Sequence, residues 1–149
     1  MSDGTHAATA HVPELLLIED SDDDVVFTRR ALERAHIGNH LSVARDGQEA
    51  LELLYADALT GNERFGLILL DLGLPKLDGR EVLTKIWADR RLRHVPVIVL
   101  TGSAEDEDVA RSYKSGAVAY LRKPVQVDQL LRAVGDLPTY RVLITRVTE

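Results

Sequence analysis

Five short apolar runs recur along the chain, and longer segments with a helical period separate them. The runs span residues 14–19, 41–45, 67–71, 95–101 and 118–121. Such alternation is typical of repeated βαβ units around a parallel sheet. The first, third and fourth runs are almost continuously apolar, which predicts strands that helices cover on both faces, whereas the weaker second and fifth runs indicate edge strands.

The intervening helices are predicted over residues 22–35, 48–59, 79–91, 105–115 and 126–134. Asp22, Asp23 and Asp24 suit the first turn of the first helix, because carboxylates interact favourably with the positive end of the helix dipole. Gly38 and Gly116 are expected to end helices. The whole pattern predicts a doubly wound α/β fold on a five-stranded parallel sheet.

Composition narrows the class of protein. The 149 residues suit a single domain, and a formal net charge of −6 disfavours nonspecific attraction to nucleic acid or anionic lipid. The absence of cysteine excludes disulfides and thiolate metal sites and fits the reducing cytosol. Residues 1–12 lack signal-peptide character, and no apolar run reaches membrane-spanning length. We therefore expect a cytoplasmic protein with a flexible N-terminus and no nucleic-acid or membrane partner.

Polar residues occur where the predicted strands end. Glu19 and Asp20 close the first strand and Asp71 closes the third. Thr101 ends the fourth strand, and Lys123 follows the fifth. In an open α/β sheet the carboxyl ends of the strands share one edge, where ligands bind. These side chains are therefore expected to lie close together.

The grouped residue types fit phosphoryl transfer to a carboxylate. Converging carboxylates repel one another unless a cation compensates, and Mg²⁺ prefers carboxylate and phosphate oxygens. The five histidines are scattered, which argues against zinc. An attacking carboxylate needs positive charge and hydrogen-bond donors around the phosphoryl oxygens. Mg²⁺, the Lys123 ammonium and the Thr101 hydroxyl can supply them around Asp71, which we therefore predict to be a phosphoacceptor.

Each of these residues taken singly also has a simpler structural interpretation. Asp20 or Ser21 can cap the following helix, the Thr101 hydroxyl can bond to backbone, and Lys123 can be a solvated surface cation. The pair Asp78 and Gly79 is a common turn signal, and we assign it no chemistry. The ordered combination across four strand ends favours a phosphoryl site over these separate roles.

Over residues 15–134 the chain resembles the receiver domains of two-component response regulators. The run LLLIED ends in an acidic pair like that of the family, and DLGLPKLDG at residues 71–79 is similar to the loop after the family's phosphoacceptor. The resemblance implies a flavodoxin-like strand order of 2-1-3-4-5. It also implies a stand-alone regulator that accepts a phosphoryl group from a sensor histidine kinase on Asp71 and then switches protein-protein interactions.

The same resemblance implies roles for individual residues. Mg²⁺, or Mn²⁺ in its place, is held by the acidic pair Glu19 and Asp20, by Asp71 and by the backbone carbonyl of Gly73. Thr101 and Lys123 bind the phosphoryl group. The resemblance also implies a cis peptide bond from Lys123 to Pro124, a form whose energetic cost is low only before proline. Tyr120 corresponds to the family's switch aromatic and acts together with Thr101.

Within the family, the chain is most similar to the small regulators paired with bacterial phytochromes, which implies a phytochrome as the sensor kinase. Residues 13–136 form the expected receiver domain. Residues 137–149 contain Pro138 and then apolar residues of high β propensity, which predicts an extended arm exchanged within a homodimer. A strand added within one chain is the alternative.

Two other classes of function remain open from the sequence. One is a Mg²⁺-dependent phosphohydrolase with Asp71 as nucleophile, although Gly73 stands where an acid or base would assist turnover. The other is an interaction domain that works without phosphorylation. The favoured hypothesis is a signalling domain that catalyses only its own phosphotransfer and dephosphorylation.

Overall fold

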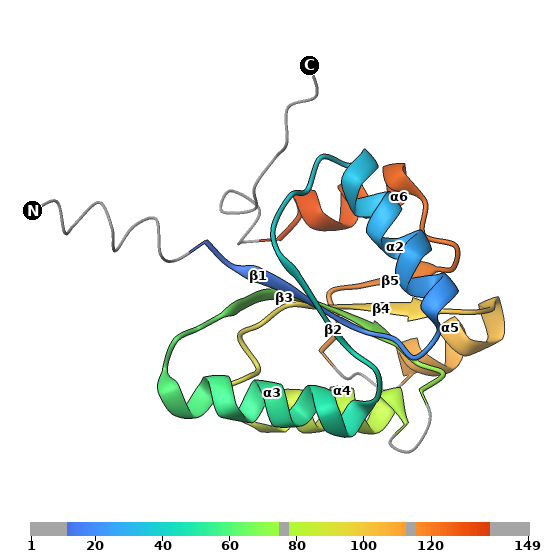
Figure 1. Ribbon diagram of the computed structural model, residues 1–149. Helices are drawn as coiled ribbons and strands as arrows, with labels where there is room; N and C mark the ends of the chain where they lie inside the picture. The colour runs from blue at the N-terminus through green and yellow to red at the C-terminus, as the bar shows by residue number, and fades with distance from the viewer. Residues whose placement is uncertain (1–11, 75–77, 113–115, 138–149) are drawn as a thin grey trace, which may run out of the picture.

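A parallel five-stranded sheet lies between layers of helices in the computed structural model, which describes residues 12–74, 78–112 and 116–137 (Figure 1). The strands follow the order β2-β1-β3-β4-β5 and all pair in parallel. Their bounds are β1 Glu14–Ile18, β2 Leu41–Ala44, β3 Phe65–Asp71, β4 Val97–Thr101 and β5 Ala119–Arg122. The predicted topology and the two predicted edge strands are therefore confirmed.

In the part of the chain that the structure describes, five helices cover the sheet. Their bounds are α2 Asp22–Arg34, α3 Gly47–Thr60, α4 Gly79–Ala88, α5 Ala104–Ser112 and α6 Val127–Gly135. Helices α2 and α6 pack on one face, and α3 and α4 pack on the other (Figure 1). Helix α5 contacts β4 and β5.

The central strands alternate their side chains between two apolar cores. In β3, Leu67 and Leu69 face the core beneath α2 and α6, whereas Ile68 and Leu70 face the core beneath α3 and α4. All seven residues of β3 are buried. Burial of each such side chain contributes about 1.5–3 kcal/mol, so the continuous apolar run stabilises both helical layers at once.

Short polar side chains fix where three helices begin. The Ser21 hydroxyl accepts from the amide of Asp24 at 3.3 Å and caps α2. Asp46 caps α3 in the same way, at 2.8 Å from the amide of Glu49. Asp78 caps α4, so the pair predicted as a turn signal marks the start of a helix instead. Such caps satisfy amides that have no partner inside the helix.

The prediction that Gly38 ends the first helix is wrong. His36 takes the left-handed conformation instead, with φ at 61°. Its amide donates to the carbonyl of Glu33 at 3.0 Å, and the amide of Ile37 donates to the carbonyl of Leu32 at 2.9 Å. This pair of hydrogen bonds is a Schellman motif, and burial of Leu32 and Ile37 adds its usual apolar contact. The helix therefore ends before the chain reaches the glycine.

Helix α4 is shorter than the predicted span of residues 79–91. Asp89 leaves the helical conformation, and its carboxylate accepts from the amide of Arg91 at 2.8 Å and from the guanidinium at 3.0 and 3.2 Å. This local side-chain to backbone pairing competes with the helix. Gly116 has φ at 86°, but residues 113–115 lie outside the described part of the chain, so its role as a helix end stays a prediction.

Gly79 allows α4 to begin directly against the end of β3. A Cβ atom at this position would lie 2.6 Å from the carbonyl oxygen of Asp71 and 2.7 Å from the Cα of Leu72. The amide of Gly79 also donates to the carbonyl of Leu72 at 3.4 Å. The loop between these residues is therefore closed at its base.

The predictions for the N-terminal segment and for the C-terminal arm fall on residues 1–11 and 138–149, which lie outside the described residues. Among the residues that are described, no helix combines the length and the apolar character needed to cross a bilayer.

Candidate functional site

The predicted site residues meet at the carboxyl edge of the sheet. Glu19 directly follows β1, Asp71 is the last residue of β3, and Thr101 is the last residue of β4. Lys123 directly follows β5. The parallel register brings these four strand ends together, because β1, β3, β4 and β5 are successive neighbours in the sheet.

Lys123 lies at the centre of this group. Its Nζ atom is 3.2 Å from Oδ1 of Asp71 and 3.4 Å from Oε1 of Glu19. A third carboxylate, that of Asp24, accepts a hydrogen bond from the same Nζ at 2.8 Å. The backbone positions Lys123 through a hydrogen bond from its amide to the carbonyl of Thr101 at 2.8 Å, and its bond to Pro124 is cis.

Three carboxylates form a group that suits a hard divalent cation. One oxygen each from Glu19, Asp20 and Asp71 lies within 4.8 Å of the others. Glu19 and Asp71 are buried, whereas Asp20 is exposed and leaves the group accessible to solvent. An all-oxygen donor set with an open side fits Mg²⁺ or Mn²⁺, which retain water ligands or bind phosphate oxygens.

Burial changes the protonation of Glu19. Loss of solvation, then a hydrogen bond to Asp71 and the negative charge of Asp71, raise the pKa of Glu19 from 4.5 to about 8, although the charge of Lys123 opposes this rise. Without a cation, the Glu19 carboxyl therefore holds a proton more readily than an ordinary glutamate does. A divalent ion bound here would compete with that proton.

Lys123 remains charged in these surroundings. Burial acts to lower its pKa, but the hydrogen bond to Asp24 and the charges of Asp71 and Glu19 outweigh burial, so the pKa is raised above its ordinary value. The site therefore keeps a permanent ammonium beside Asp71.

The Thr101 hydroxyl is buried and has no hydrogen-bond partner among the described residues. An unpaired buried hydroxyl costs about 1–3 kcal/mol of stability. The structural alternative for Thr101, a hydroxyl bonded to backbone, is therefore not observed. A polar atom kept at such a cost, at the end of the strand next to Asp71, is available to a ligand.

Gly73 and Tyr120 lie beside the group. The amide of Gly73 donates to Oδ1 of Asp71 at 3.1 Å and orients that carboxylate. Tyr120 is partly buried in β5, pairs with Val99 of β4 and packs against the core beneath α3 and α4. The carbonyl role of Gly73 and the switch role of Tyr120 stay predictions.

Asp24 is a site residue that was not predicted from the sequence, where it was expected only to interact with the dipole at the helix terminus. It occupies the third position of a Ser-capped helix, where an acidic side chain commonly turns back to the amide of the cap. Here the amide of Ser21 donates instead to Oε2 of Glu19 at 3.4 Å. No sequence signal separates these two orientations, because they differ only in the rotamer of Asp24.

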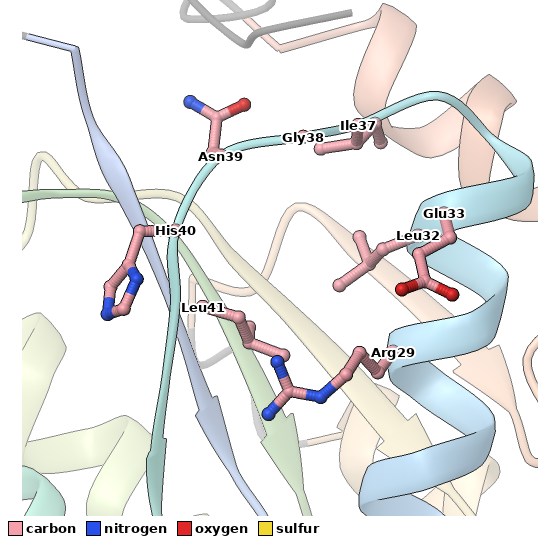
Figure 2. Close-up of a pocket in the computed structure, with 8 residues that line it drawn as sticks. All are labelled: Arg29, Leu32, Glu33, Ile37, Gly38, Asn39, His40 and Leu41. Atoms are coloured by element: carbon pink, nitrogen blue, oxygen red, sulfur yellow. The ribbon is translucent and has the colours of Figure 1, made fainter. Parts of the chain in front are cut away.

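A separate cavity of about 340 Å³ lies between the C-terminal half of α2 and the start of β2 (Figure 2). Arg29 and Glu33 line it from the helix, and Asn39 and His40 from the following loop. It adjoins the amino edge of the sheet, and none of its eight lining residues belongs to the predicted site. This cavity therefore offers no substrate pocket to Asp71.

Comparison with known proteins identifies the family. The family model of the response regulator receiver domain matches residues 15–135. The probable methanogenesis regulatory protein FilR2 of Methanothrix harundinacea is 39% identical over 126 residues, which cover 85% of this chain and 81% of that protein. The response regulator Rcp1 of Synechocystis sp. is 38% identical over 127 residues, which cover 85% of this chain and 86% of Rcp1.

The solved structures that resemble this chain are response regulators as well. The bacteriophytochrome response regulator AtBRR is 40% identical with a TM-score of 0.77, over 92% of this chain and 98% of AtBRR. The Mn²⁺-bound form of Rcp1 is 34% identical with a TM-score of 0.65, over 92% of this chain and all of that one. Together with the flavodoxin-like strand order and the carboxylate group, these matches show a signalling domain rather than a classical enzyme. The chain belongs to the receiver domains of response regulators and is homologous to single-domain, phytochrome-associated members of that family.

Proposed function

We propose that Asp71 accepts a phosphoryl group from the phosphohistidine of a sensor kinase, with Mg²⁺ held at the adjacent carboxylates. One observation carries the proposal. Asp71 is a buried carboxylate only 3.2 Å from a lysine ammonium, on the strand next to a threonine whose buried hydroxyl has no hydrogen-bond partner in the described part of the chain. A positive charge and a spare donor around a buried carboxylate suit a phosphoryl group better than they suit a purely structural ion pair.

In the transfer, an Asp71 carboxylate oxygen forms a bond to phosphorus while the phosphorus–nitrogen bond to histidine breaks. The imidazole leaves with the electron pair and takes up a proton. The Gly73 amide, at 3.1 Å from Oδ1 of Asp71, fixes the orientation of the nucleophile. Lys123 neutralises charge on the transferred oxygens, and Thr101 supplies a hydrogen bond to one of them.

Mg²⁺ is the proposed cation, held by Glu19, Asp20, Asp71 and the carbonyl of Gly73, and Mn²⁺ can replace it at the same oxygens. When bound, the cation neutralises the carboxylates and the phosphoryl oxygens. The all-oxygen group supports this assignment, as does the Mn²⁺-bound form of the relative Rcp1. The same residues are proposed to support slow loss of the phosphoryl group to water.

The proposed switch couples Thr101 to Tyr120. Attraction of the Thr101 hydroxyl to the phosphoryl group leaves space behind β4, into which Tyr120 of the neighbouring strand turns. The surface formed by α5, β5 and α6 then changes its affinity for partner proteins. The partly buried position of Tyr120 against the core supports this hypothesis.

The proposed kinase is a bacterial phytochrome, because AtBRR and RtBRR, both bacteriophytochrome response regulators, resemble this chain over 92% of its length.

We also propose that residues 137–149 form an arm exchanged within a homodimer. Deletion of residues 138–149 is expected to halve the solution mass measured by light scattering. An unchanged mass would contradict dimerisation through the arm.

Acetyl phosphate labelling tests the phosphoacceptor. With Mg²⁺, the wild-type protein is expected to gain one phosphoryl group in intact-mass measurement, and a chelator is expected to prevent the gain. Asp71→Asn should remain unlabelled, because its amide is a poor nucleophile. Asp78→Asn is the matched control, since asparagine also caps a helix, and it should be labelled normally. A persistent phosphoryl adduct on Asp71→Asn would overturn the proposal.

The Glu19 carboxyl makes Mg²⁺ binding depend on pH. Because its pKa is raised to about 8, Mg²⁺ must displace a proton at lower pH, and binding should strengthen on the order of tenfold between about pH 6.5 and 8.5. In the metal-free protein, the same shift contributes stability that is fully present below 4.5 and lost as the pH rises through about 8.

Titration calorimetry at the two pH values measures the affinity and the proton released. In Glu19→Gln, Mg²⁺ binding should be weaker and should lose most of its pH dependence. Equal wild-type affinities at the two pH values would count against displacement of a proton from Glu19.

Thr101→Val separates stability from function. Removal of this hydroxyl, which has no partner among the residues that the structure describes, should raise the free energy of unfolding by about 1 kcal/mol in urea denaturation. The same change should slow labelling by acetyl phosphate about tenfold or more, because a donor to the phosphoryl group is lost.

Thr84→Val is the control for this pair of measurements, since the Thr84 hydroxyl is exposed and donates to the carbonyl of Arg80 at 2.9 Å. It should produce neither the stabilisation nor the slower labelling. A clear loss of stability in Thr101→Val would refute the interpretation of the buried hydroxyl.

A further inference from the structure

Asp24 makes the shortest contact of Lys123 with any of its three carboxylates. The Nζ atom lies 2.8 Å from Oδ2 of Asp24, compared with 3.2 Å to Asp71 and 3.4 Å to Glu19. The Asp24 side chain is 31% exposed and that of Lys123 is 19% exposed, so this ion pair is partly withdrawn from water. In the resting domain, the lysine is therefore held more closely by helix α2 than by the phosphoacceptor.

The start of α2 fixes the position of Asp24. Its amide is bonded to the Ser21 hydroxyl at 3.3 Å, which anchors its backbone in the first turn. Its carboxylate is not needed by the helix cap, because the amide of Ser21 donates to Glu19. Asp24 can therefore bind Lys123 without weakening the cap.

Three carboxylates share the charge of Lys123 in this state. Its ammonium donates hydrogen bonds to Asp24 at 2.8 Å and to Glu19 at 3.4 Å, and forms an ion pair with Asp71 at 3.2 Å. A phosphoryl group on Asp71 adds acceptor oxygens and about two negative charges, which compete with Asp24 for the same ammonium. A bound cation offsets the charges of Glu19 and Asp71. Asp24 is not among the described carboxylates that group around the candidate cation position, so its charge continues to compete.

We propose that Asp24 is a positioning residue that competes with the phosphoryl group for Lys123 and thereby slows phosphorylation of Asp71. This inference rests on the proposed phosphoacceptor role. Asp24 acts through Lys123 and does not touch the reacting atoms. Neutralisation of Asp24 frees the ammonium for the incoming group and removes a repulsive charge from the site.

Asp24→Asn and Asp23→Asn form a matched pair for the test. Both remove one negative charge from the same helical turn, but the carboxylate of Asp23 is exposed and makes none of the three contacts to Lys123. The full chain is incubated with acetyl phosphate and Mg²⁺. In the reaction, an Asp71 oxygen bonds to phosphorus, the bond from phosphorus to the acetate oxygen breaks, and acetate leaves with the electron pair.

Asp24→Asn is expected to be labelled roughly three- to tenfold faster than the wild type, and Asp23→Asn within about twofold of it. Beryllofluoride, a phosphoryl mimic, should bind Asp24→Asn at a correspondingly lower concentration. In a Lys123→Met background the acceleration should vanish, since the competition needs the ammonium. A structural role for Asp24 would not produce this dependence on Lys123.

An equal or slower rate in Asp24→Asn overturns the inference, as does an equal acceleration in Asp23→Asn or one that persists with Lys123→Met. These outcomes leave the proposed function intact, provided that the wild type is labelled on Asp71. A wild type that is not labelled overturns the proposed function and this inference together. The wild-type reaction therefore distinguishes the two failures.

Discussion

A single ammonium allows the apolar sheet to end in a group of carboxylates. The strands β1, β3 and β4 are buried almost to their carboxyl ends, where Glu19 and Asp71 lie within the protein rather than in water. Buried carboxylates are costly unless charge or protonation compensates them. Lys123 compensates Asp71 and Asp24, and burial lets Glu19 hold a proton more readily, which would remove a further charge. The charge balance of this edge therefore depends on the same lysine that the proposed chemistry uses.

The architecture could be predicted from the sequence because strands that are buried on both faces of a sheet have a recognisable, continuously apolar sequence. A strand such as β3 must be apolar at every position, and helices on either side must show a 3.6-residue period. Helix ends were less predictable, since several local hydrogen-bonding patterns can end a helix. His36 in the left-handed conformation replaced the expected Gly38, and the carboxylate of Asp89 ended α4 before its predicted boundary.

Most of the candidate site could also be predicted, because parallel strands bring sequence-distant ends to one edge. The position of Lys123 beside Asp71 follows from strand order and chain direction. The contact of Asp24 with Lys123 does not, because it depends on a side-chain rotamer within a helical turn. The lack of a hydrogen-bond partner for the Thr101 hydroxyl within the described residues could not be predicted either, because it depends on the positions of the side chains around it.

The close approach of Gly79 to the end of β3 bears on how this site can evolve. The backbone at residues 71 and 72 and the first residue of α4 are in direct contact, so the two ends of the intervening loop are tied together. A larger side chain at position 79 would push the start of α4 away from the end of β3 and so displace the strand end that carries Asp71. The geometry of the site therefore constrains residue 79 to glycine, although no chemistry is assigned to it.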